Sequence, residues 1–114
     1  MNVRRTRYHC PVEVTVELIG GKWTVVLLAH LKQGKRFYGE LRRLMPGITE
    51  KMLTQRLRQL ERDGLIEREP ENGRVGYRLS EEGAGLAPAL QALYDWGEAR
   101  AEREGIRIEP VSPV

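Results

Sequence analysis

The sequence has few of the residues that build covalent or metal-bound frameworks. It contains one cysteine, Cys10, and two histidines, His9 and His30, among 114 residues. A single cysteine excludes an intrachain disulfide and a cysteine-rich zinc site. The histidines, aspartates and glutamates show no spacing typical of metal ligands. We therefore expect neither a metal nor any other cofactor.

Long apolar runs and catalytic groupings are absent too. No stretch reaches the ~18 apolar residues of a membrane span, and no apolar segment with a cleavage site follows the basic residues 1–9. We expect a cytoplasmic protein without membrane contact. The sequence also shows no nucleophile–base pair, no paired acids and no cofactor loop, so we do not expect an enzyme.

Charge is plentiful but unevenly distributed. Residues 35–62 contain eight basic and three acidic side chains, a net charge of +5, whereas residues 80–104 carry −4. A basic segment in the middle of a chain with a net charge of only +3 is typical of a nucleic-acid contact surface. The length fits one domain, residues 1–114, with an arm at 1–9 and a loose tail at 105–114.

Apolar spacing and turn residues predict four helices in the first half of the chain. They are expected at 11–19 (with Val12, Val16 and Ile19 as the apolar stripe), at 22–31, at 37–45 (Phe37, Leu41, Leu44 and Met45) and at 49–62 (Leu53, Leu57 and Leu60). Pro11 suits a first helical position, and Thr49 suits a helix N-cap. Since residues 22–31 are apolar nearly all round, that helix is expected at the centre of the fold.

The second half of the chain predicts a hairpin and a long helix. Asn72-Gly73 separates an expected strand at 65–69 from another at 74–79, where Val75, Tyr77 and Leu79 alternate with Arg74 and Arg78. Ser80 is expected to cap a long final helix that Pro88 kinks or restarts. The order predicts a mainly α fold with a small β-wing: a winged helix-turn-helix, whose sharp turn is Pro46-Gly47.

The helix after that turn has a face that suits DNA. Opposite its leucines, a helical projection places Lys51, Gln55, Arg58 and Arg62, with Thr54 at the edge and no acid. Arg and Lys can donate to guanine, Gln can pair with adenine, and Thr can contact a thymine methyl or a phosphate. The helix N-terminus at Thr49 offers N–H groups to phosphate, and Arg74 and Arg78 of the wing are expected beside the DNA backbone.

Two other interpretations of this basic face remain open. Basic residues opposite an apolar stripe are commonly just a solvated surface. A winged helix can also bind another protein in place of DNA, and its exposed helix face would then carry acids or apolar side chains. The presence of Lys51, Gln55, Arg58 and Arg62 favours double-stranded DNA as the partner.

Residues along most of the chain resemble the HxlR family of bacterial winged-helix regulators. The resemblance is carried by residues 10–13 (CPVE), 18–23 (LIGGKW), 36–37 (RF), 40–43 (ELRR), 46–48 (PGI), 51–58 (KMLTQRLR), 60–61 (LE) and 63–65 (DGL), then by Tyr77, Leu79, Gly83 and Trp96-Gly97. It implies a sequence-specific transcriptional regulator that places its recognition helices in adjacent major grooves of a palindromic site. Family wings are often longer than residues 70–73 here.

The resemblance also implies a homodimer whose first and last helices form the interface. The residues expected there are Val12, Val16, Leu90, Leu93, Tyr94 and Trp96. The sequence agrees, because the final helix has more apolar surface than one small monomer can cover. An aromatic-lined ligand pocket between subunits is an alternative role for Tyr94 and Trp96. A two-fold dimer would bind half-sites ~34 Å apart.

Cys10 has two interpretations. Some family members sense oxidants or electrophiles through a cysteine at this position. Here, the helix N-terminus and the nearby Arg4, Arg5 and Arg7 favour a thiolate. The alternative is a small packing residue at the dimer interface. The sequence leaves open the effector, the operator, and whether the protein represses or activates.

Overall fold

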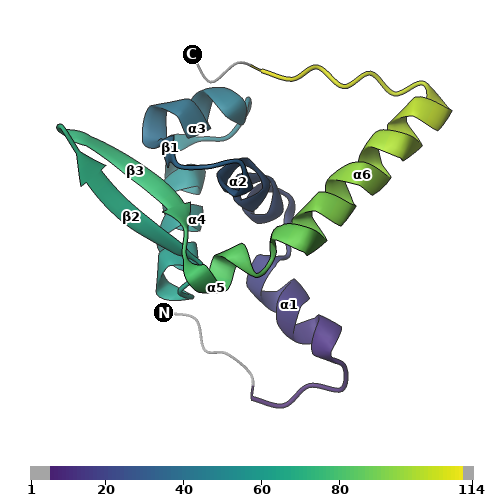
Figure 1. Cartoon of the computed structure of the whole chain (residues 1–114), viewed down its shortest axis with the longest axis horizontal. Coiled ribbons are helices and arrows are strands. Elements are labelled where there is room, and N and C mark those ends of the chain that lie inside the picture. The colour runs from purple at the N-terminus through teal and green to yellow at the C-terminus, as the bar shows by residue number, and fades with distance from the viewer. Residues whose placement is uncertain (1–5, 112–114) are drawn as a thin grey trace.

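The computed structural model describes residues 6–111 and shows a helical core with a β-wing on one side (Figure 1). The elements in chain order are α1 (Pro11–Ile19), α2 (Lys22–Lys32), β1 (Arg36–Phe37), α3 (Tyr38–Leu44), α4 (Glu50–Arg62), β2 (Ile66–Glu71), β3 (Arg74–Leu79), α5 (Glu81–Ala84) and α6 (Ala87–Glu104). The predicted fold class is confirmed. Arg4, Arg5 and the last residues of the expected tail lie outside the described part.

The core surrounds α2, as its apolar composition predicts. Leu27, Leu28 and Leu31 of this helix are buried, and they belong to one cluster with Leu41 of α3 and Leu57 of α4. Such a helix has no polar face to turn to water, so the other elements must cover it. The scaffold that holds α3 and α4 in place is therefore built on α2.

The wing is a three-stranded antiparallel sheet in the order β1-β3-β2. Asn72 and Gly73 have φ angles of 49° and 77°, the positive values that a two-residue type I′ hairpin turn requires. The hairpin is confirmed, with β2 running to Glu71 and not ending at Glu69. The prediction of Phe37 in a helix is wrong, because Phe37 pairs with Gly76 as part of β1. A strand of two residues is too short to show the alternation of apolar and polar side chains by which a strand is recognised in a sequence.

The predicted final helix is divided into α5 and α6. Ser80 caps α5, since its hydroxyl oxygen accepts a hydrogen bond from the Gly83 N–H (3.0 Å) and donates to the Gly64 carbonyl (2.6 Å). A Cβ on Gly83 would clash with the Leu65 carbonyl, so α5 lies against the start of the wing. Pro88 falls in the first turn of α6, where its missing N–H costs no hydrogen bond. It restarts the helix and does not kink it.

Helices α1 and α6 project from the core on the side away from the wing (Figure 1). Val12 and Val16 of α1 are exposed, as are Leu93, Tyr94 and Trp96 of α6. Leu90, expected at a dimer interface, is instead 2% exposed. Its place in the interface is a wrong prediction, because Leu90 lies on the one side of α6 that packs against the core. No helix within residues 6–111 is long and apolar enough to cross a membrane.

Candidate nucleic-acid interface

The turn between α3 and α4 fixes the recognition helix against the core. Gly47 has a φ of 93°, and the N–H of the buried Ile48 donates to the Met45 carbonyl (3.1 Å). Thr49 then caps α4, as predicted: its hydroxyl oxygen accepts from the Met52 N–H at 3.0 Å. The glycine supplies the left-handed backbone that the sharp turn needs. These contacts define where α4 begins and which face it turns outward.

The outward face of α4 borders a shallow surface depression. Its lining comprises Tyr38, Glu50, Lys51, Thr54, Gln55 and Arg58. Three of the predicted site residues, Lys51, Gln55 and Arg58, are exposed there. None of these three side chains forms a hydrogen bond or ion pair with another residue in the range 6–111. Their donors are therefore free to contact an external polar partner.

Two further residues in this depression were not predicted. The Tyr38 hydroxyl lies 3.4 Å from Oγ1 of Thr54 and ties the start of α3 to the middle of α4. Glu50, in the first turn of α4 and outside the predicted basic face, also lines the depression. Its carboxylate lies 3.4 Å from Arg42, which offsets the charge. A helical projection of α4 alone could not find Tyr38, which belongs to another helix.

Arg62 lies apart from the other predicted contacts. It occupies the last turn of α4, is not part of the depression, and donates to the side-chain oxygen of Gln59 at 3.0 Å. Lys51, by contrast, stands in the first turn of the helix. Since a straight helix rises 1.5 Å per residue, the two cations lie at opposite ends of α4. The structure therefore brings together Lys51, Thr54, Gln55 and Arg58, but not Arg62.

Basic side chains on the outer face of the wing are paired with glutamates of β2. Arg78 contacts Glu67 at 2.6 Å and also pairs with Glu69. Lys35 lies 3.4 Å from Glu69 and 3.5 Å from Glu71. The hydrogen bond from Arg78, together with that from Lys35, holds the pKa of the Glu69 carboxyl below its ordinary value. Glu69 therefore stays ionised at neutral pH, and its negative charge partly neutralises Lys35 and Arg78.

Arg74 has a different environment. Its guanidinium carbon stands 3.6 Å from the centre of the Phe37 ring, a cation–π contact, and its side chain is exposed at the end of the hairpin. Stacking leaves the N–H groups at the edge of the guanidinium available for hydrogen bonds. Of the two predicted wing contacts, Arg74 is therefore better placed than Arg78 to reach a phosphate.

The pairing on the wing predicts the effect of replacing Glu69 by glutamine. The change removes one negative charge beside Lys35 and Arg78, which keep Glu71 and Glu67 as partners, so binding to DNA of unrelated sequence should strengthen several-fold. The salt dependence should steepen by about one phosphate contact, a change of ~0.9 in the slope of log K against log salt. Fluorescence anisotropy in a salt series measures both quantities.

Glu104→Gln provides the matched control for Glu69→Gln. It removes the same charge from an exposed ion pair, that between Arg100 and Glu104 on α6. An equal gain in both variants would show that only net charge changed, and would contradict a specific role for Glu69.

Cys10 is exposed and occupies the N-cap position of α1. Its thiol makes no capping hydrogen bond, and the backbone N–H of His9 donates instead to the Glu13 carboxylate at 3.1 Å. Pro11 follows at the start of the helix, as predicted. The sulfur is therefore accessible to a reagent from solvent in this chain.

These features define a winged helix-turn-helix protein. The HxlR-like helix-turn-helix family model matches residues 18–105, and the chain belongs to this family of transcriptional regulators, which are not enzymes. The HTH-type transcriptional regulator YtcD of Bacillus subtilis is 48% identical over 104 residues, covering 89% of this chain and 82% of YtcD. The resemblance inferred from the sequence is confirmed.

Two solved structures have the same fold. The redox regulator HypR in its oxidized form has a TM-score of 0.75 and 44% identity, covering 79% of this chain and 96% of HypR. The quinone-bound YodB of B. subtilis has a TM-score of 0.67 and 31% identity, covering 79% of this chain and 99% of YodB.

Proposed function

We propose that this chain, acting as one winged-helix domain in the cytoplasm, binds a palindromic operator as a homodimer and regulates transcription. The observation that carries the proposal is the exposed face of α4, where Lys51, Gln55 and Arg58 stand directly after the helix-turn-helix turn without partners among the described residues. Side chains of these types can read base edges in a major groove. A protein-binding winged helix would instead present acids or apolar side chains there.

The exposed apolar side chains support the homodimer. The large hydrophobic residues that are exposed in the described part are Val12, Val14, Val16, Leu93, Tyr94, Trp96, Ile106, Ile108 and Val111. All of them belong to α1, α6 or the segment that follows α6. Apolar surface concentrated in this way is typical of an interface. A second copy would cover it and hold two α4 helices at a fixed spacing.

A response to oxidants or electrophiles through Cys10 is the second part of the proposal. Its exposed thiol supports this role, as do the structural relatives, a redox regulator and a quinone-bound protein. A thiolate would add to a quinone by forming a carbon–sulfur bond. Alternatively, the Cys10 thiols of two subunits would join as a disulfide, giving two electrons to an oxidant and releasing two protons. Either product would alter α1, which carries part of the proposed dimer surface.

A DNA titration tests the first part of the proposal. Purified protein is titrated at fixed salt onto DNA from upstream of its own coding sequence, and onto the same DNA scrambled. We expect binding to upstream DNA at least ~1,000-fold tighter than to scrambled DNA. Equal affinities would leave autoregulation unsupported, and a genome-wide site selection would follow. Failure of that selection would favour the protein-binding alternative.

The same titration after treatment with a quinone or peroxide tests Cys10. Treated wild-type protein should lose specific binding, and treated Cys10→Ser should keep it. If both proteins keep it, Cys10 is only a packing residue and the regulator stands without a thiol response. If both lose it, the reagent acts elsewhere on the protein.

A further inference from the structure

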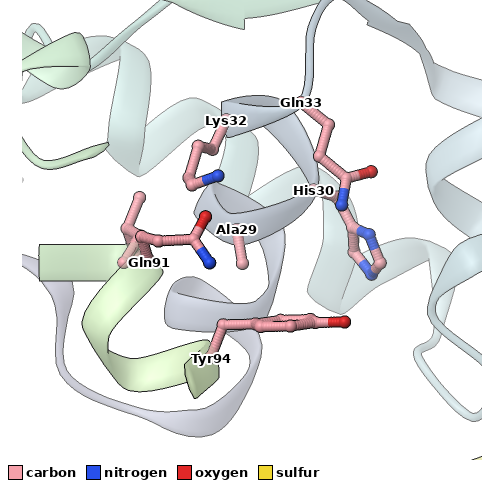
Figure 2. Close-up of a pocket in the computed structure, with 7 residues that line it drawn as sticks. Ala29, His30, Lys32, Gln33, Gln91 and Tyr94 are labelled. Atoms are coloured by element: carbon pink, nitrogen blue, oxygen red, sulfur yellow. The ribbon is translucent and has the colours of Figure 1, made fainter. Parts of the chain in front are cut away.

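A small pocket lies where α2 meets α6, away from the DNA-contacting face of α4, and one of its residues, Tyr94, also belongs to the proposed dimer surface. Its lining comprises Ala29, His30, Lys32 and Gln33 from the end of α2, with Leu90, Gln91 and Tyr94 from α6 (Figure 2). The volume is about 140 Å³. A protein cavity of about 150 Å³ can hold a benzene molecule, so this pocket has room for a single ring.

The apolar part of the lining is suited to a flat ligand. Figure 2 shows the Tyr94 ring lying across the pocket, with the methyl group of Ala29 on the α2 side of it. The buried Leu90 adds an aliphatic wall. An aromatic ring in the pocket could stack on the Tyr94 ring in an offset arrangement.

The polar groups lie at the ends of this apolar part. The Lys32 amine and the Gln91 amide are at one end, and His30 is near the tyrosine hydroxyl at the other (Figure 2). The Gln91 nitrogen donates to Asp95 at 2.9 Å, which leaves the amide oxygen as an acceptor. Lys32 supplies a positively charged ammonium group with N–H donors for a ligand.

The charge of the lining favours an anion. Among residues 6–111, no carboxylate lines the pocket. Burial, with a further contribution from the positive charge of Arg36, lowers the pKa of His30, while a backbone hydrogen bond with Leu44 acts in the opposite direction. His30 is therefore neutral at pH 7, and Lys32 is the charged member of the lining. A partly enclosed ammonium binds a carboxylate through charge-assisted hydrogen bonds.

We propose that this pocket binds a single-ring aromatic carboxylate, with the ring against Tyr94 and the carboxylate at Lys32. The pocket bridges two elements with different roles. Helix α2 is the centre of the DNA-binding core, and α6 carries much of the proposed dimer surface. A ligand held by both would favour one angle between them and so one spacing of the two α4 helices. This regulatory consequence rests on the proposed function, but binding in the pocket does not.

The test uses the whole protein without DNA and benzoate as the probe, followed by isothermal titration calorimetry. Benzamide is the neutral control of the same shape. We expect saturable benzoate binding, with benzamide weaker by about tenfold, the scale of a hydrogen bond to a charged group. Lys32→Met should weaken benzoate by a similar factor and leave benzamide unchanged. Ala29→Leu should abolish binding of both by filling the pocket, with folding checked by circular dichroism.

Lys22→Met is the matched control, since it removes the same side chain from the opposite end of α2. It should leave benzoate binding unchanged. Absence of saturable binding, equal affinity for benzoate and benzamide, or equal losses in Lys22→Met and Lys32→Met would each overturn the proposal. If benzoate binds as expected but leaves affinity for the operator unchanged, the site stands and its regulatory role is overturned. A protein that binds benzoate but no DNA would contradict the proposed function alone.

Discussion

Replacing Arg58 by alanine is expected to weaken binding to the operator by about 1–3 kcal/mol, which is roughly 5- to 150-fold. Arg58 is exposed on α4 and has no hydrogen-bond or ion-pair partner among the described residues, so its guanidinium can contact a base edge directly. Loss of a base contact removes the protein's preference for one base at one position of the operator. Affinity for scrambled DNA should therefore change much less than affinity for the operator. Titration of both DNAs at several salt concentrations measures the difference.

Arg103→Ala is the control for this experiment. Arg103 is also an exposed arginine, but it lies in the last turn of α6, away from the recognition helix. It should leave operator affinity almost unchanged. An equal loss on operator and scrambled DNA in Arg58→Ala, with a shallower salt slope, would identify Arg58 as a phosphate contact. No loss in Arg58→Ala would remove this residue from the interface.

Replacing Leu93 by aspartate is expected to dissociate the proposed dimer. Leu93 is 54% exposed in the isolated chain and stands one turn from Trp96, which is 65% exposed. In a dimer, the substitution would lose the burial of leucine and place an unpaired carboxylate in an apolar interface. The combined cost of ~3 kcal/mol or more corresponds to at least ~100-fold in the dimer dissociation constant. Sedimentation velocity over a concentration series measures it directly.

Ala84→Asp introduces the same charge at an exposed position of α5, outside the proposed interface. It should leave the oligomeric state unchanged. Because Leu93 is half exposed in the single chain, Leu93→Asp should keep its helical circular dichroism. It should bind a palindromic operator far more weakly than wild type while retaining weak binding to a half-site. A wild-type protein that stays monomeric at all concentrations would contradict the interface.

The recognition helix was predictable because its signals are local. Thr49 as N-cap, the leucines at 53, 57 and 60, and the glycine at 47 all act within one or two helical turns. A period of 3.6 residues then determines which side chains share a face with the leucines and which oppose them. The Asn72-Gly73 hairpin was predictable for the same reason, since its turn requires positive φ angles at adjacent residues.

Contacts between elements decided what local patterns could not. Lys35 meets Glu69 and Glu71 across 34 and 36 positions of sequence, so the paired state of the wing cations depends on how β1 joins β3. The same strand pairing placed Phe37 in a sheet and brought Arg74 over its ring. Each of these arrangements needs two segments that are far apart in the chain, and a sequence pattern cannot show such a partner.

The sequence by itself determined α1 to α4, the hairpin of β2 and β3, their order and the basic face of α4, because helix periodicity, caps and turns act over a few residues. Tertiary structure decided which apolar side chains are buried within the monomer. Leu90 and Leu93 stand three positions apart on α6, yet the first is buried against the core and the second is exposed. Both are leucines in the apolar stripe of α6, so the sequence pattern alone does not distinguish them. Only the packing direction of α6 against α2 separates a core residue from one available to a second copy.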